Sequence, residues 1–261
     1  MSTILLLDDD AQFSTLVASL LERRKHTVFQ ARTGARAKEA VSCGEVDLAI
    51  VDYRLPDIDG VAWITWLREL GAAIPVIFLS GFSCDNHMLN RLRNVLSVPV
   101  VLKKPLDPLS FAALVDKQLN DHSNMLKRYT SKPTTSIDRL NQVQDMYLEE
   151  LDRAMLRGLT NEYLKELPSQ ILKLADAING AFNSSGDSAL AIAICEAHRL
   201  RGTTGSYGLK NVSEMMGTIE DCLLEIARVD SSIDRSAIWS RVEKALRSAT
   251  ESTNKTSAEE I

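Results

Sequence analysis

Short apolar runs alternate with amphipathic stretches over the first 120 residues of the chain. The runs predict buried strands, and the stretches between them predict helices that cover both faces of a sheet. Near-continuous Leu, Ile and Val in the first, third and fourth runs indicate strands buried on both faces. The pattern therefore predicts an α/β fold with a doubly wound, five-stranded parallel sheet. The strands are expected at 3–7, 27–30, 47–51, 75–79 and 98–102, and the helices are expected to begin near Ala11, Gly34, Gly60, Asp85 and Pro108.

The pattern changes after about residue 120. Residues 121–137 are polar and predict a linker, and no strand signal recurs beyond them. From 138 onward the spacing of apolar positions predicts helices only, with breaks near 158–160, 183–186, Gly208 and 230–232. An apolar stripe in 209–229 is typical of a helix packed in a bundle (Val212, Met216, Ile219, Leu223 and Ile226). We therefore expect a first domain at 1–120, a linker at 121–137, an all-α helical-bundle domain at 138–250 and a flexible tail at 251–261.

Composition and charge narrow the class of protein. With 261 residues, 45% of them hydrophobic and 25% charged, the chain is long enough for two globular domains. Its net charge of −5 argues against nucleic-acid binding, which needs a concentrated basic face. The four cysteines form no C-x-x-C pair, so we expect neither a zinc site nor a disulfide framework. No apolar run approaches the length of a membrane span, so we expect a cytoplasmic protein without direct membrane insertion.

Acidic side chains follow two of the predicted buried strands. Asp8 and Asp9 come directly after the first run, and Asp52 comes directly after the third. Open α/β sheets place their ligands at the carboxyl ends of their strands, so these carboxylates are expected to converge. Clustered carboxylates repel one another unless a cation neutralises them, and Mg²⁺ prefers such oxygen ligands. The sequence therefore predicts a Mg²⁺ site at this edge.

Two further polar residues lie at the ends of the remaining strands. Ser80 follows the fourth run, and Lys104 follows the fifth. A hydroxyl and an ammonium that face a carboxylate and Mg²⁺ are the groups that offset negative charge during phosphoryl transfer. A Mg²⁺-dependent hydrolase with an Asp nucleophile is an alternative, but its D-x-D-x-T or D-x-D-x-V motif requires Thr or Val where this chain has Gln12.

The strings ILLLDDD, LAIVDYRLPDIDG, PVIFLSG and VVLKKP, in this order and spacing, resemble the receiver domain of two-component response regulators. The resemblance covers roughly residues 1–120 and implies the flavodoxin-like receiver fold. It implies that Asp52 is the phosphoacceptor, that Ser80 and Lys104 contact the phosphoryl oxygens, and that Asp10 faces solvent or caps the next helix. It also implies that Mg²⁺ is bound by Asp8, Asp9, Asp52 and the backbone carbonyl of Arg54. One position departs from the family: Val101 stands where receivers commonly carry an aromatic switch residue.

His198 has a distinctive setting in the helical part. It lies on a predicted helix from about Asp187 to Ser206, on a mostly exposed face that it shares with Arg201, Gly202 and Gly205. Each of the two glycines inside the helix lowers its stability by about 1 kcal/mol relative to alanine, so we expect them to serve a function. The absence of side chains there lets another protein's active site close over the ring, and Arg201 is placed to pair with a phosphoryl group. A surface histidine near a helix kink is the alternative.

The string AHRLRGTTGSYG resembles the signature of histidine phosphotransfer (Hpt) domains, which are four-helix bundles, and the likeness extends over roughly 140–250. Its one visible departure is Arg201 in place of the usual lysine. The resemblance implies that His198 carries the phosphoryl group on Nε2, and that a docked receiver supplies the Mg²⁺, the lysine and the aspartate.

Together these resemblances imply a bacterial phosphorelay protein with two phosphoacceptors and no kinase catalytic domain. The implied partners are sensor or hybrid histidine kinases and other receiver proteins, and a homodimer stays open. Transfer between Asp52 and His198 of one chain also stays open. The alternative is a phosphorylation-switched scaffold, whose helical domain binds a partner or dimerises without phosphotransfer.

Overall fold

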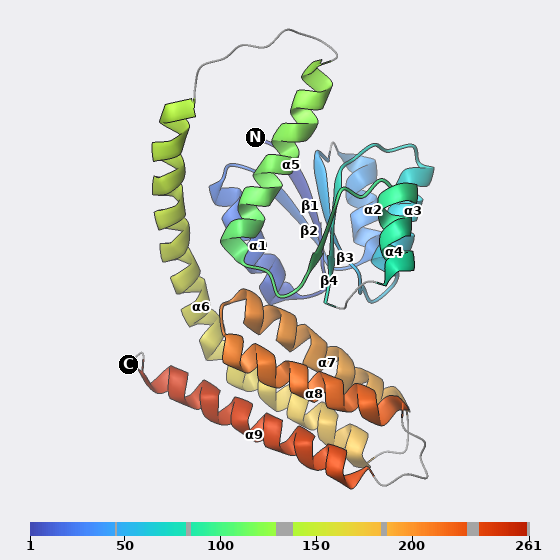
Figure 1. The fold of residues 1–261 in the computed structure, drawn as a ribbon, viewed down its shortest axis with the longest axis vertical. Coiled ribbons are helices and arrows are strands. Elements are labelled where there is room, and N and C mark those ends of the chain that lie inside the picture. Colours follow the sequence, from blue (N-terminus) through green and yellow to red (C-terminus); the bar gives the residue numbers. More distant parts are fainter. Residues whose placement is uncertain (45, 82–84, 129–137, 184–186, 229–234, 260–261) are drawn as a thin grey trace. The chain divides into compact units, whose positions relative to one another are not determined.

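The computed structural model describes residues 1–44, 46–81, 85–128, 138–183, 187–228 and 235–259 (Figure 1). The chain divides into two compact units, Met1–Arg157 and Gly158–Ile261, and each is described by itself.

The first unit contains the predicted parallel sheet. All four strand pairs are parallel, in the order β2-β1-β3-β4-β5, and every residue of β3 and β4 is buried. The doubly wound α/β fold predicted from the apolar runs is therefore confirmed. The strands are β1 (Thr3–Leu7), β2 (Thr27–Ala31), β3 (Leu48–Asp52), β4 (Val76–Ser80) and β5 (Val100–Lys103).

Helices cover both faces of this sheet. Alternate residues of β1 enter different cores: Ile4 and Leu6 join the α1 and α5 side, whereas Leu5 and Leu7 join the α2 and α3 side. Figure 1 shows α1 and α5 on one face and α2, α3 and α4 on the other. The helical segments are α1 (Ala11–Arg23), α2 (Gly34–Cys43), α3 (Gly60–Glu69), α4 (Asn86–Asn90) with the π-helical turn η1 (Arg91–Val95), and α5 (Pro108–Arg128).

Four of these helices begin at a side-chain cap directly after a strand or loop. Asp10 accepts hydrogen bonds from the backbone N–H groups of Gln12 and Phe13, which confirms its expected capping role for α1. Thr33, Asp59 and Asp85 cap α2, α3 and α4 in the same way. Because the caps satisfy backbone N–H groups that have no partner within the helix, they fix where each helix starts at the site-bearing edge.

The described residues from 138 onward are helical with short turns, as expected. The helices are α6 (Asp138–Asn183), α7 (Asp187–Ser206), α8 (Lys210–Arg228) and α9 (Ser236–Glu259). The break expected near 158–160 is wrong, because α6 runs through it without interruption and also contains Pro168. Of the expected linker 121–137, residues up to Arg128 continue α5, and 129–137 lie outside the described residues.

The apolar stripe predicted for 209–229 is buried on α8. Val212, Met216, Ile219, Leu223 and Ile226 are each at most 5% exposed. Ala193, Ala197, Leu200 and Thr204 are fully buried on α7. Among the described helices, none has both the length and the apolarity that crossing a bilayer requires.

Candidate functional site

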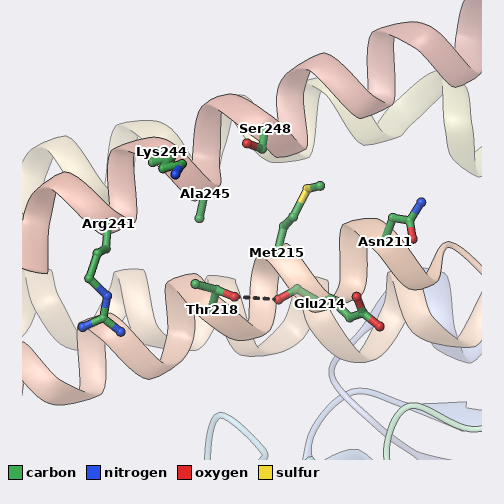
Figure 2. A pocket seen from close by; sticks show the side chains of 8 residues that line it. All are labelled: Asn211, Glu214, Met215, Thr218, Arg241, Lys244, Ala245 and Ser248. Carbon is green, nitrogen blue, oxygen red and sulfur yellow. Dashed lines mark hydrogen bonds between the residues drawn. The ribbon is translucent and has the colours of Figure 1, made fainter.

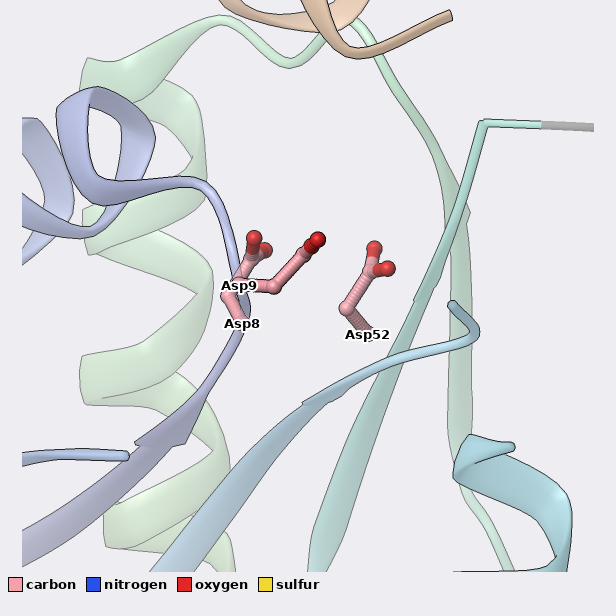
Figure 3. A group of neighbouring side chains, drawn as sticks. All are labelled: Asp8, Asp9 and Asp52. Atoms are coloured by element: carbon pink, nitrogen blue, oxygen red, sulfur yellow. The ribbon is translucent and has the colours of Figure 1, made fainter. Parts of the chain in front are cut away.

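Three carboxylates meet at the carboxyl edge of the sheet, as the sequence predicts. Asp8 and Asp9 follow β1, and Asp52 ends β3, the strand that pairs with β1. One oxygen from each lies within 4.8 Å of the others. Figure 3 shows the three side chains converging above the strand ends. Asp8 and Asp52 are buried, whereas Asp9 is exposed.

Lys104 joins this cluster from the end of β5. Its Nζ lies 2.5 Å from Asp8 Oδ2 and 2.8 Å from Asp52 Oδ1, and 4.3 Å from the centre of the Phe13 ring. Burial opposes the charged form, but the two carboxylates outweigh it and raise the pKa of Lys104 above its usual value. The ammonium is therefore a fixed positive charge beside Asp52.

Ser80 and Arg54 complete the edge. Ser80 ends β4, is 2% exposed, and is paired in register with Lys103. The Ser80 carbonyl accepts a hydrogen bond of 2.8 Å from the Lys104 N–H, which ties the ends of β4 and β5 together. The Arg54 N–H donates to Asp52 Oδ2 at 2.8 Å and so orients that carboxylate. The Arg54 carbonyl as a metal ligand stays a prediction.

The electrostatics of the cluster suit a divalent cation. Burial raises the pKa of Asp8 to about 8, and repulsion from Asp52 and Asp10 adds to this effect while Lys104 opposes it. Burial and repulsion from Asp52 also raise the pKa of Asp9. One ammonium does not balance three converging carboxylates, and oxygen-only donors are what Mg²⁺ prefers. The residues thus fit Mg²⁺, and Asp8, Asp9 and Asp52 would be its side-chain ligands.

We expect the stabilisation by Mg²⁺ to grow with pH. Folding raises the pKa of Asp8 from 3.8 to about 8, so the folded chain retains a proton there that the unfolded chain loses. The free energy of unfolding therefore falls as pH rises between these values, and a bound cation restores it. Thermal unfolding with and without MgCl₂ should show a larger shift in Tm at pH 8 than at pH 6. Equal shifts at both values, or an unchanged response in Asp8→Asn, would contradict this.

The second predicted phosphoacceptor, His198, lies on α7. Its Nδ1 is 2.6 Å from Oε1 of Glu220 on α8, and the other oxygen, Oε2, accepts a 3.0 Å hydrogen bond from Arg201 Nη1. Although burial opposes it, hydrogen bonds and charge from His198 and Arg201 lower the pKa of Glu220. Glu220 is thus an ionised carboxylate that faces both residues.

The expectation that His198 and Arg201 are mostly exposed is wrong. Only 14% of the His198 side chain and 33% of the Arg201 side chain are exposed, because Glu220 and α8 cover them. Sequence reasoning also missed Glu220, which is 1% exposed. Its signal was a carboxylate beside Ile219 in the apolar stripe of α8, where a charge needs a partner.

Gly202 and Gly205 lie inside α7, which continues through both to Ser206. The Gly202 carbonyl accepts a hydrogen bond from the Ser206 hydroxyl, so the helix is intact there. Their part in admitting a partner's active site stays a prediction.

A groove of about 440 Å³ lies between α8 and α9. Figure 2 shows the side chains that line it: Asn211, Glu214, Met215, Thr218, Arg241, Lys244, Ala245 and Ser248. On α8 the lining residues Asn211, Met215 and Thr218 are spaced by four and three residues, so the groove lies on a different face of the helix from Glu220, which contacts His198.

Comparisons with known proteins show similarity over part of the chain. Transcriptional regulatory protein ZraR of Escherichia coli O157:H7 is 30% identical over 133 residues, which are 51% of this chain and 30% of that protein. Response regulator GtcR of Aneurinibacillus migulanus is 30% identical over 141 residues, 53% of this chain and 57% of that protein. This chain thus spans about a third of ZraR and just over half of GtcR.

Two further matches differ in extent. Aerobic respiration control sensor protein ArcB of Escherichia coli strain K12 is 26% identical over 218 residues, 80% of this chain and 26% of that protein. The signal receiver domain of an HD domain-containing protein from Pseudomonas fluorescens Pf-5 is 25% identical, with a TM-score of 0.44, and covers 48% of this chain and 98% of its own. The response regulator receiver domain family matches residues 4–116. This part of the chain, which carries the carboxylate cluster, Ser80 and Lys104, is therefore a response regulator receiver domain.

Proposed function

We propose that this protein is a phosphorelay intermediate in which Asp52 accepts a phosphoryl group and His198 carries one. A receiver domain acts in two-component signalling, and the match to this family supports the first half of the proposal. The observation that carries the second half is the 2.6 Å contact between His198 Nδ1 and the buried Glu220 carboxylate. A histidine held in this way has one defined tautomer, which a nucleophile needs.

At the receiver site, an oxygen of Asp52 attacks the phosphorus of a donor phosphohistidine. The P–N bond breaks, and its electron pair returns to the donor imidazole. Lys104, 2.8 Å from Asp52, and Ser80 would offset charge on the phosphoryl oxygens. When bound, Mg²⁺ would supply further positive charge at the same oxygens. Asp8 and Asp9 would hold the ion, together with Asp52 and the Arg54 carbonyl.

At the helical site, Glu220 accepts a hydrogen bond from Nδ1–H of His198, so the ring lone pair lies on Nε2. Nε2 attacks the phosphorus of an aspartyl phosphate, the P–O bond breaks, and its electron pair returns to the carboxylate of the donor receiver. The ring then carries positive charge, which Glu220 offsets. Among the described residues of this unit, no group of side chains is arranged to hold a metal ion. The partner receiver would therefore supply the Mg²⁺, the lysine and the aspartate.

The partners follow from this chemistry. The chain would exchange phosphoryl groups with sensor or hybrid histidine kinases and with receiver domains of other proteins. Support comes from the similarity to ArcB, a sensor protein, which extends over 80% of the chain and thus beyond residues 4–116. The helical unit Gly158–Ile261 would act as an Hpt domain.

The test is labelling of wild type and two variants by different donors. Wild type and His198→Gln should take label from a small acyl phosphate on Asp52 only when Mg²⁺ is present, and Asp52→Asn should not. Phosphorylated receiver domains, including the labelled His198→Gln chain itself, should then label Asp52→Asn on His198. The two products are separable because phosphohistidine is labile in acid and stable in base, whereas acyl phosphate is labile in base.

Two outcomes would overturn parts of the proposal. Absence of Mg²⁺-dependent label on Asp52 would contradict the receiver chemistry. Absence of acid-labile label from every donor, with signalling intact in His198→Gln, would favour the scaffold in which the helical unit only binds a partner.

A further inference from the structure

Three residues of α8 form a stripe that faces the site on α7. Ser213, Gly217 and Glu220 are spaced by four and three residues, so they lie on one face of the helix. Ser213 Oγ donates a 2.8 Å hydrogen bond to the Arg201 carbonyl, and Glu220 accepts from the Arg201 guanidinium. Both ends of the stripe therefore contact Arg201, one at its backbone and one at its side chain.

Gly217, between them, leaves the space in which the Arg201 side chain lies. A Cβ added at Gly217 would be 3.1 Å from Arg201 Nε and 3.2 Å from Cζ, both closer than ordinary contact. Glycine weakens a helix interior relative to alanine, and α8 continues for ten residues or so beyond this point. The close approach of the guanidinium supplies the reason for a glycine here.

We infer that Gly217 is a positioning residue: it leaves the space that lets Arg201 pair with Glu220, and it thereby sets the fraction of chains that are phosphorylated on His198. The inference rests on the proposed phosphotransfer at His198. It also accounts for the departure at position 201, where the resembled signature has lysine: the broad, flat guanidinium needs room along α8 that a lysine stem does not.

The effect on His198 is electrostatic. The two Glu220 oxygens are divided between His198 Nδ1 and Arg201 Nη1. In the phosphorylated state Glu220 offsets the positive ring, so the charge that is left over is that of the phosphoryl dianion on Nε2, and the seated guanidinium lies near enough to offset part of it. When Arg201 is displaced toward solvent, that attraction is lost, and the equilibrium moves from phosphohistidine toward the aspartyl phosphate of the donor.

The functional test measures this equilibrium in Gly217→Ala, Gly217→Leu and Arg201→Ala. The matched control is Gly180→Ala, a helical glycine whose added Cβ would meet nothing within 4 Å. We expect Gly217→Leu and Arg201→Ala to lower the phosphohistidine fraction by about threefold to tenfold, as one unbalanced charge at this range would. Gly217→Ala should have a smaller effect and Gly180→Ala none. When Arg201 is already alanine, Gly217→Leu should lower the phosphohistidine fraction no further. When Arg201 is lysine, Gly217→Leu should lower this fraction much less than it does in wild type.

A second measurement reports the seating itself and needs no phosphoryl group. The Arg201 Nη1–H resonance, from the group that donates to Glu220, should be slow to exchange in wild type and Gly180→Ala, and fast in Gly217→Leu and in Glu220→Gln. Because Gly217→Ala favours the helix, its Tm should not fall even where transfer does. Three results would overturn the inference. The first is an equal phosphohistidine fraction in Gly217→Leu and Gly180→Ala, and the second is a fall in that fraction on Gly217→Leu when Arg201 is already alanine. The third is an exchange rate of the Arg201 N–H that is the same in Gly217→Leu as in wild type. A wild-type chain with no acid-labile label would instead contradict the proposed function. The exchange rates would still show whether Gly217 positions Arg201 against Glu220.

Discussion

Gly60→Ala is expected to abolish most Asp52 phosphorylation and to lower the free energy of unfolding of the receiver unit by about 1–3 kcal/mol, the range for overpacked sites. Gly60 begins α3, and its N–H donates a 2.8 Å hydrogen bond to the Tyr53 carbonyl. An added Cβ would lie 2.2 Å from the Asp52 carbonyl oxygen and 3.1 Å from its carbonyl carbon. Backbone atoms cannot rotate away, so the end of β3 or the start of α3 must move, and Asp52 moves with it.

Urea unfolding and Asp52 labelling would measure both effects. The control is Gly44→Ala, where the nearest atom to the added Cβ, the Ala40 carbonyl oxygen, is 3.8 Å away. A Gly60→Ala chain that labels at the wild-type rate would contradict the close approach of α3 to Asp52.

Asp152→Asn is expected to destabilise the first unit by about 3 kcal/mol, the lower end of the range for breaking a buried ion pair. Asp152 lies on α6 and is fully buried, although α6 begins after the receiver family match ends. It accepts hydrogen bonds from Arg23 Nε at 3.2 Å and from Arg24 Nη2 at 3.0 Å. Among the described carboxylates, Arg24 would keep Asp116, to which its Nη1 donates at 2.6 Å. The lower end applies because Arg23 is one-third exposed and regains water.

The measurement is chemical unfolding at low and moderate salt. Glu39→Gln is the control, because it also removes one negative charge and breaks a 2.5 Å ion pair, with Arg36, in which both side chains are at least 60% exposed. Exposed pairs of this kind contribute well under about 1 kcal/mol. If the two variants lose equal stability, the buried network does not hold the start of α6 to the receiver.

This contact also bears on where the first unit ends. Met155 and Leu156 of α6 pack against the core that α1 and α5 share, and the compact unit reaches Arg157. The receiver family match ends at residue 116, so about forty residues beyond it belong to the same unit. A chain cut at residue 120 would expose this apolar surface and leave Arg23 and Arg24 without Asp152.

The sequence by itself determined the α/β sheet, the edge at which the chemistry lies and the start of each receiver helix. Strand periodicity and capping are local, so apolar runs followed by Asp8, Asp52, Ser80 and Lys104 specify both the strand ends and the residues that meet there. The extent of α7, from Asp187 to Ser206, was likewise predictable from its apolar stripe and the turn residues around it.

Only the tertiary structure decided what depends on a neighbouring helix. Gly158 lies inside α6 rather than at a break, because one glycine weakens a helix by only about 1 kcal/mol, which the rest of a long helix outweighs. Glu220, buried against His198 and Arg201, and Asp152, buried against Arg23 and Arg24, gave no local signal that named their partners. Their partners are 19 to 129 residues away, and pairing over such separations follows from helix packing rather than from any short-range pattern.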